Sequence, residues 1–150
     1  MKKLAFFLIV VVCLTFAGCV DGEKAREYYY SDEQIASLHE NYSETGSKLE
    51  SSGNKGFSYK STKFNGYNTV WNVSGLNDGS AVANASLSLS EGQAKLVHID
   101  ADNKVTTIVE CSGEEGSKTV EVRLSMTNGK NRFKLVGYDC KDIEVKLSLD

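Results

Sequence analysis

The sequence predicts an all-β domain, an antiparallel β-sandwich or jelly roll of about eight strands. From Phe57 to the end of the chain, apolar residues recur at every second position, which is the period of a strand with one buried face. Turn sequences rich in Asn, Asp and Gly separate these segments, and Asn128-Gly129 is the strongest hairpin signal among them. Short strands with regular turns are typical of sandwiches and barrels.

Several segments show this alternation. They cover residues 57–64, 67–73, 81–89, 94–99, 105–109, 120–126, 133–135 and 143–149. In the third segment Ala83, Ala85 and Leu87 alternate with polar residues, which predicts one buried and one solvated face. The fourth segment contains Leu96, Val97 and Ile99, apolar residues at odd and even positions, which predicts burial on both faces.

The residues before the predicted domain have a different composition. Ser31 and Gln34 form a capping box, and apolar residues then recur at helical spacing, which predicts a short helix over 32–43. Residues 44–56 are rich in Ser, Gly, Asn, Lys and Glu, which predicts a flexible linker. Three tyrosines at 28–30 fit either a membrane–water interface or packing against the domain.

The first nineteen residues carry a targeting signal. A basic start precedes an apolar run from Leu4 to Phe16, which is too short to span a membrane, and the run ends in Ala17-Gly18-Cys19. This resembles the signal peptide and lipobox of a bacterial lipoprotein precursor, although Phe16 stands where the family usually has Leu. The resemblance implies a diacylglyceryl group on Cys19 and cleavage before it. The alternative is cleavage by an ordinary signal peptidase, which would leave Cys19 as a thiol.

The chain therefore divides into three expected parts. They are a signal peptide over 1–18, a lipid-anchored tether with a short helix over 19–56, and the sandwich domain over 57–150. The 17 basic residues less Lys2 and Lys3 leave 15, against 20 acidic residues, so the mature surface would be weakly acidic. Such a surface offers no electrostatic footprint for nucleic acid.

The closing segment resembles known domains. Residues 129–137, followed by 143–149, are similar to the last strands of galactose-binding-like and carbohydrate-binding jelly rolls. They are also similar to a small, uncharacterised lipoprotein domain of Gram-positive bacteria, in which a Gly-Gln-Ala-Lys-Leu-Val stretch like 92–97 comes before them. The resemblance covers roughly residues 71–150. It implies a fold more than a ligand, because one fold carries many different sites.

Two cysteines, Cys111 and Cys140, remain in the predicted domain. An exported protein meets oxidising conditions, and both residues lie at the rims of predicted strands, so we expect a disulfide between them. The alternative is two separate thiols, one of them buried as a small apolar side chain.

Motifs for catalysis and metal binding are missing from the expected mature sequence. His39 and His98 are its histidines, no serine lies in a Gly-x-Ser-x-Gly turn, and neither Cys-x-x-Cys nor His-Glu-x-x-His occurs. An EF-hand loop starting at Asp100 would need Gly and Glu where Val105 and Cys111 stand. Glu114-Glu115 fits a solvated loop. We therefore expect no catalytic residue, no metal and no cofactor.

Aromatic residues are the candidates for ligand binding. Trp71 and Tyr67 share a predicted strand face, and Tyr59 and Tyr138 are further candidates to line a shallow site. The sharper interpretation is a platform for a sugar ring; the alternative is a core tryptophan, since Trp is usually highly buried.

The expected function is binding rather than catalysis. We expect a lipoprotein held at the extracytoplasmic face of the cell membrane, with a non-enzymatic binding or interaction domain of the cell envelope. If the envelope has two membranes, Val20 in place of Asp after Cys19 is similar to outer-membrane sorting signals. The alternative function is that of a carbohydrate-binding module. The expected partners are the membrane, through Cys19, and an envelope protein or glycan.

Replacing Cys19 with Ser should release the protein from the membrane, because acyl chains hold a protein through about 0.8 kcal/mol per buried CH₂. Detergent partitioning and intact mass of the cell-derived protein measure the effect. Cys13→Ser, within the apolar run, is the matched control and should change neither. Unchanged partitioning and unchanged mass of the Cys19→Ser protein would contradict the lipid anchor.

Overall fold

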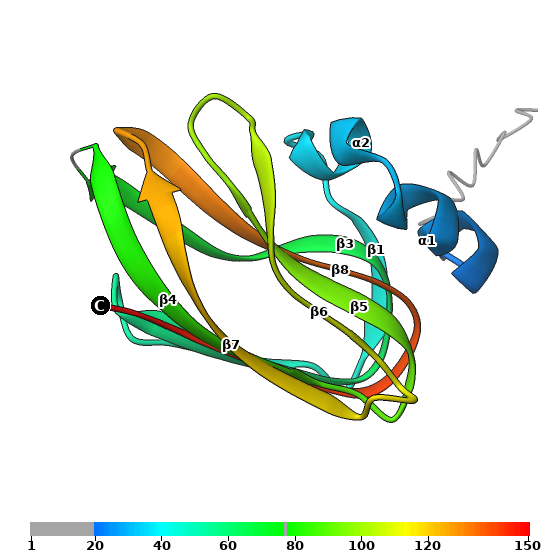
Figure 1. Ribbon diagram of the computed structural model, residues 1–150. Coiled ribbons are helices and arrows are strands. Elements are labelled where there is room, and N and C mark those ends of the chain that lie inside the picture. Colours follow the sequence, from blue (N-terminus) through cyan, green and yellow to red (C-terminus); the bar gives the residue numbers. More distant parts are fainter. Residues whose placement is uncertain (1–19, 77) are drawn as a thin grey trace, which may run out of the picture.

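The computed structural model describes residues 20–76 and 78–150, so Cys19 and the signal sequence lie outside the described residues. The described chain is a β-sandwich, as predicted, with every strand pair antiparallel (Figure 1). The elements are α1 (Gly22–Tyr29), α2 (Asp32–Ala36), β1 (Asn41–Thr45), β2 (Lys48–Ser51), β3 (Gly56–Leu76), β4 (Gly79–Ser88), β5 (Glu91–Ile99), β6 (Val105–Ser112), β7 (Ser117–Met126) and β8 (Gly129–Leu149). Within these ranges neither helix is long and apolar enough to cross a membrane.

Two strands of 21 residues, β3 and β8, run through both layers of the sandwich. Their ladder extends from the pair Gly56–Ser148 to the pair Leu76–Gly129. The first layer has the order β2-β3-β8-β4-β7 and contains the beginning of β3 and the end of β8. The second layer has the order β1-β3-β8-β5-β6 and contains the other halves of β3 and β8.

The sequence predicts two strands where the structure has one, both in β3 and in β8. The two segments at 57–64 and 67–73 are joined because β3 bends at Gly66 without leaving its ladder. Gly66 has φ +102°, and a Cβ there would lie 2.1 Å from the carbonyl oxygen of Asn41 on β1. A side chain would therefore collide with the neighbouring strand, so only glycine allows this bend.

Apolar side chains from the inner faces of both layers form the main core. On β4, Ala83, Ala85 and Leu87 are buried, which confirms the predicted alternation. On β8, Phe133 and Leu135 are fully buried and face this core.

The predicted linker at 44–56 is wrong, because β2 and the end of β1 lie within it. Both strands pair with β3 along the same edge, with Asn41 opposite Tyr67 and Lys48 opposite Lys60. All four residues of β2 are exposed, so main-chain hydrogen bonds rather than apolar burial hold this polar strand in place. A strand of this kind has the composition of a linker, which explains the error.

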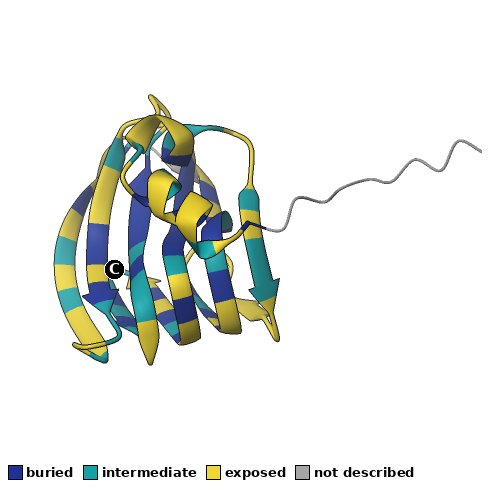
Figure 2. Ribbon diagram, turned by 90° about the vertical axis from the view of Figure 1, so that its right-hand side faces the viewer, coloured by how far each residue is buried: buried dark blue, intermediate teal, exposed yellow. Residues whose placement is uncertain are grey.

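Helices α1 and α2 cover the outer face of the second layer (Figure 2). Helix α1 lies where the sequence suggested a tether; the Asp21 side chain caps it by accepting the Lys24 N–H (2.9 Å), and Ala25 and Tyr29 are buried. Half of the predicted capping box of α2 is confirmed, since Ser31 Oγ accepts the Gln34 N–H (3.3 Å). The other half is wrong, because the Ser31 N–H donates to the Tyr28 carbonyl (3.1 Å) and not to the Gln34 side chain. The helix ends at Ala36, however, and not near residue 43.

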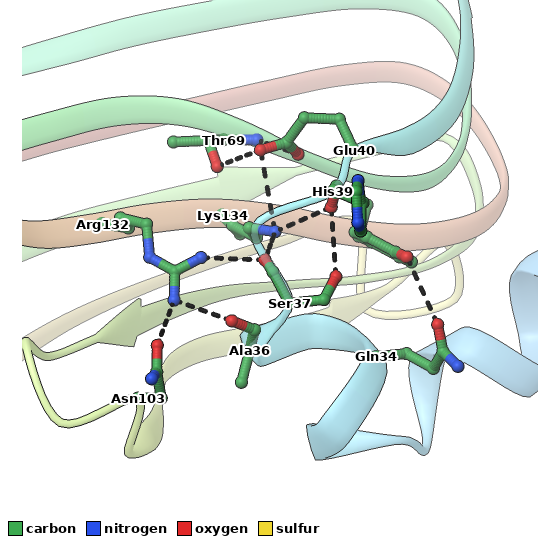
Figure 3. A network of polar contacts seen from close by, with 10 residues as sticks. Gln34, Ala36, Ser37, His39, Glu40, Thr69, Asn103, Arg132 and Lys134 are labelled. Carbon is green, nitrogen blue, oxygen red and sulfur yellow. Dashed lines mark hydrogen bonds and ion pairs between the residues drawn. The ribbon is translucent and has the colours of Figure 1, made fainter.

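Two buried cations of β8 hold the end of α2 against the sheet (Figure 3). The Arg132 guanidinium donates to the carbonyl oxygens of Ala36 (2.7 Å) and Ser37 (2.8 Å). Lys134, whose side chain is fully buried, donates to the Ser37 carbonyl (2.8 Å) and lies 3.7 Å from the Glu40 carboxylate. Burial lowers the pKa of Lys134, and Glu40 opposes that shift. Cations suit this place, because the last carbonyls of a helix lack intrahelical partners.

Gly66→Ala should strongly destabilise the fold. The left-handed φ alone costs a residue with a side chain about 1–3 kcal/mol, and the collision with β1 adds to that cost. The matched control is Gly53→Ala, because Gly53 also has a positive φ (+60°) but a Cβ there meets nothing within 4 Å. Urea unfolding of both variants measures the difference. Equal free energies of unfolding would show that the close approach at Gly66 is unimportant.

Candidate functional site

A hollow of about 730 Å³ lies where the β4–β5 turn meets the β6–β7 turn, and we name it the turn pocket. Most of its lining residues carry polar side chains. They are Ser90, Glu91, Gly92, Gln93, Ser112, Gly113, Glu114, Glu115 and Tyr138. Hydroxyl, amide and carboxylate groups thus surround one half-buried tyrosine, a composition suited to ligands rich in hydrogen-bonding groups.

Two glycines bring the walls of the turn pocket together. A Cβ on Gly92 would lie 2.4 Å from the carbonyl of Asp139, and a Cβ on Gly113 would lie 2.6 Å from the Cα of Glu91. The Gly113 N–H also donates to the Gly92 carbonyl (2.9 Å). The two turns and the bend of β8 therefore touch through their backbones, and the pocket is built on strand ends.

A chain of hydrogen bonds fixes the polar groups of the pocket. Tyr138 Oη donates to Gln93 Oε1 (2.9 Å), and Gln93 Nε2 donates to Glu110 Oε1 (3.0 Å). Tyr29 Oη, from α1, donates to the same Glu110 oxygen (2.6 Å). Burial and then Glu110 raise the pKa of Tyr29, so this phenol stays protonated and donates. The chain sets the orientation of the Gln93 amide, because its oxygen accepts and its nitrogen donates.

The ring of Tyr138 is enclosed by α1. The Arg26 guanidinium lies 5.5 Å from the ring centroid of Tyr138, and the ring of Tyr29 meets it edge to face at 5.2 Å. These contacts hold the ring by cation–π and aromatic attraction. The ring of Tyr138 is therefore held in place by α1, and its hydroxyl is bonded to Gln93, another lining residue of the pocket.

Acidic side chains stand around the pocket in different electrostatic settings. Glu91 forms an ion pair with Lys141 (2.7 Å). Glu115 accepts the backbone N–H of Ser112 (2.9 Å), which lowers the pKa of this carboxyl. Glu114, which also lines the pocket, is exposed. Among the residues that the structure describes, no three His, Cys, Asp or Glu side chains lie close enough to hold a metal ion.

A second hollow, of about 620 Å³, lies on the first layer and crosses β2, β3, β8, β4 and β7. Its floor carries short side chains such as Ser58, Ser86 and Ser148. Phe57 is its one aromatic lining residue and is buried in the core. This hollow therefore lacks the fixed phenol and amide pair that distinguishes the turn pocket.

The aromatic residues proposed from the sequence as a sugar platform lie in the interior. Trp71, Tyr67 and Tyr59 are 6%, 2% and 2% exposed. The Trp71 ring lies between Phe57 and Phe133, and its Nε1–H donates to the Gly53 carbonyl (3.0 Å). None of these three rings offers an open face to a sugar. Of the four aromatic residues named from the sequence, only Tyr138 reaches the turn pocket.

The expected disulfide is absent, and Cys111 and Cys140 are both buried free thiols. Cys111 lies on β6 and Cys140 on β8, with β5 between them. Two strand spacings make about 9–10 Å, beyond the roughly 7 Å that a disulfide can bridge between Cα atoms. Burial raises the pKa of Cys140 to about 12, and its thiol donates to the Gln93 carbonyl (3.2 Å).

Sequence reasoning missed the part of the site that comes from α1. Arg26 and Tyr29 lay in a segment interpreted as a tether. Two signals were present: Asp21 as a helix cap, and Ala25 and Tyr29 four residues apart on one helical face. Gln93 carries no signal of its own, because an exposed-looking glutamine in a strand is common.

Comparison with known proteins gives distant similarity only. The sequence matches no model of a known protein family and no curated protein. Among solved structures, the module TmCBM61 in complex with β-1,4-galactotriose is 15% identical, with a TM-score of 0.43 over 73% of this chain and 86% of that one. A module of Cellvibrio mixtus lichenase 5A in complex with cellotriose is 11% identical, with a TM-score of 0.38 over 73% and 90%.

A family 35 carbohydrate-binding module from Clostridium thermocellum is 10% identical, with a TM-score of 0.36 over 71% of this chain and 91% of that one. At identities and TM-scores this low, the three structures say nothing about a ligand of this chain.

The two histidines have separate structural settings. His98 is buried, and its Nε2 lies 2.9 Å from Asn131 Oδ1; burial lowers its pKa. His39 is exposed, and its carbonyl oxygen accepts from Lys134. Neither lines the turn pocket.

The burial of His98 should make stability fall in mild acid. In the unfolded chain a histidine binds its proton near pH 6.5, whereas the folded pKa is lower, so below about pH 6.5 the unfolded state binds more protons and gains stability. Urea unfolding between pH 5 and 8 should show this loss in the wild type, and His98→Gln should flatten it. His39→Gln is the control. The same pH slope in wild type and His98→Gln would contradict the prediction.

Proposed function

We propose that this domain binds a carbohydrate in the turn pocket. The observation that carries the proposal is the fixed pair of Tyr138 hydroxyl and Gln93 amide, which hydrogen bonds hold in place at the pocket. Sugars present neighbouring hydroxyls that donate and accept at once, and a pre-oriented amide and phenol match both roles. Groups that are already ordered lose little entropy on binding, so such a site gains affinity.

The carboxylates complete this match. Glu91 and Glu114 stand among the lining residues beside the hydroxyls of Ser90 and Ser112. A carboxylate accepts two hydrogen bonds from adjacent hydroxyls, and hydrogen bonds to charged groups are stronger than those between neutral groups. The acidic lining and the net charge of −3 disfavour nucleic acid and other polyanions.

Binding fits this pocket better than glycoside hydrolysis does. A general acid for that reaction needs a carboxyl with a raised pKa. The pKa of Glu115 is lowered instead, because the Ser112 backbone N–H stabilises its charged form. Glu91 is held by Lys141 in an ion pair. We therefore assign the pocket a non-enzymatic role.

The proposal places the domain on the extracytoplasmic face of the membrane, with an envelope glycan as its partner and Cys19 as its anchor. The support is the lipobox pattern described above. Val20, the residue after Cys19, is buried, and its carbonyl accepts from Ser43 Oγ (2.8 Å). A lipid on Cys19 would then be separated from the folded domain by almost no tether, and the domain would sit close to the membrane.

Gln93→Ala should weaken glycan binding roughly tenfold or more. The substitution removes the amide that would bond to the sugar, and a lost hydrogen-bond partner costs about 1–3 kcal/mol. The measurement is calorimetric titration of residues 20–150 with a panel of soluble neutral oligosaccharides. Ser86→Ala, in the second hollow, is the control and should keep wild-type affinity. The proposal fails if the wild type binds no member of the panel, or if Ser86→Ala loses binding and Gln93→Ala does not.

A further inference from the structure

Tyr30 is an exposed aromatic residue at the end of α1, the helix whose Tyr29 contacts the pocket residue Tyr138. It follows the last residue of α1 and is 68% exposed, while its neighbour Tyr29 is 1% exposed. The sequence allows two settings for the three tyrosines at 28–30, a membrane–water interface or packing against the domain. The three tyrosines have different environments in the structure. Tyr29 belongs to the apolar cluster under the helices, and Tyr28 packs against that cluster. Tyr30 projects into solvent.

The position of Tyr30 is tied to the pocket through its aromatic neighbours. Its ring meets that of Tyr29 edge to face at 5.2 Å, and Tyr29 meets Tyr138 at the same centroid distance. Burial and then the Tyr30 hydroxyl raise the pKa of Tyr138. Tyr30 is therefore connected to Tyr138, a lining residue of the turn pocket, through one shared aromatic neighbour, Tyr29.

Tyr30 is also more exposed than Tyr138, which is only half-exposed. Arg26 and Tyr29 enclose the ring of Tyr138. Other exposed apolar side chains among the described residues are Leu38, Tyr42 and Leu49, and Tyr42 stacks on Phe64. The apolar face of a pyranose ring packs well on an aromatic ring, and a tyrosine adds a polar tip that tolerates water.

We propose that Tyr30 is the aromatic platform of a second subsite, so that the ligand is an oligosaccharide with one unit in the turn pocket and the next on Tyr30. This inference rests on the carbohydrate function proposed above. Helix α1 is anchored to the sheet through Tyr29 and Glu110, so the backbone of its C-cap residue Tyr30 is held in place. The N-terminal helix then serves recognition as well as covering the sheet.

The test compares chain lengths of the same sugar. Residues 20–150 are titrated with the monosaccharide and the trisaccharide of the glycan that the wild type binds, for wild type, Tyr30→Ala and Tyr30→Phe. Tyr30→Ala should weaken trisaccharide binding about tenfold, which corresponds to about 1.4 kcal/mol, and leave monosaccharide binding unchanged. Tyr30→Phe should retain wild-type affinity. Leu38→Ala, another exposed residue of the N-terminal segment (78%), is the matched control.

The outcomes distinguish the second subsite from the carbohydrate function on which it rests. Glycan binding by wild type with equal trisaccharide affinity in Tyr30→Ala would overturn the subsite and leave the carbohydrate function standing. An equal loss for the monosaccharide and the trisaccharide would also overturn it, because Tyr30 would then belong to the first subsite. If no glycan binds to wild type, both proposals fail.

A vesicle measurement tests the membrane role of Tyr30. Residues 20–150 are mixed with vesicles of phosphatidylethanolamine and phosphatidylglycerol, and sedimentation measures the bound fraction. The subsite predicts the same small bound fraction for wild type and Tyr30→Ala. A loss of vesicle binding in Tyr30→Ala with unchanged trisaccharide affinity would overturn the subsite in favour of a membrane contact.

Discussion

The ladder between β3 and β8 carries both layers of the sandwich, because each strand begins in one layer and ends in the other. The remaining strands attach to this pair directly or through one neighbour: β1 and β2 to β3, β4 and β5 to β8, and β6 and β7 beyond them. Partners that lie from 129 − 76 = 53 to 148 − 56 = 92 positions apart must therefore meet before either layer can be completed, so the fold depends on long-range pairing. Gly66 makes this geometry possible by letting β3 bend where a side chain would strike β1.

The same pair of strands also determines how the N-terminal segment is held. In the second layer, the outer face of β8 presents Arg132 and Lys134 beside apolar Val136. Burying two cations costs free energy unless they find partners, and the carbonyls at the end of α2 supply those partners. The apolar residues around them then bury Tyr29 and Ile35. Helices and sheet are thus matched in both polarity and shape, and α1 and α2 form part of the domain.

This arrangement gives the turn pocket its character. Turns alone would supply flexible carboxylates and hydroxyls, but α1 adds the hydroxyl of Tyr29 to the chain of hydrogen bonds that orients Gln93. It also contacts the ring of Tyr138, and Tyr30 at the end of the helix remains exposed. A rigid scaffold with a few fixed polar groups is the general design of small-ligand sites, and binding residues are commonly placed on loops that such a scaffold positions.

Local pattern determined much of this protein. The alternation along β4 predicted its buried face, and Ser31 and Gln34 predicted the start of α2. The turn signals predicted an antiparallel sandwich. Each of these features depends on neighbours within a few residues of the chain. Tertiary structure alone decided the rest. Strands β1 and β2 form because the edge of β3 offers hydrogen bonds to a polar segment, and Cys111 and Cys140 stay apart because β5 lies between them. The turn pocket joins Gln93, Tyr138 and the end of α1, and no local pattern can report a contact among residues that only the folded sheet brings together.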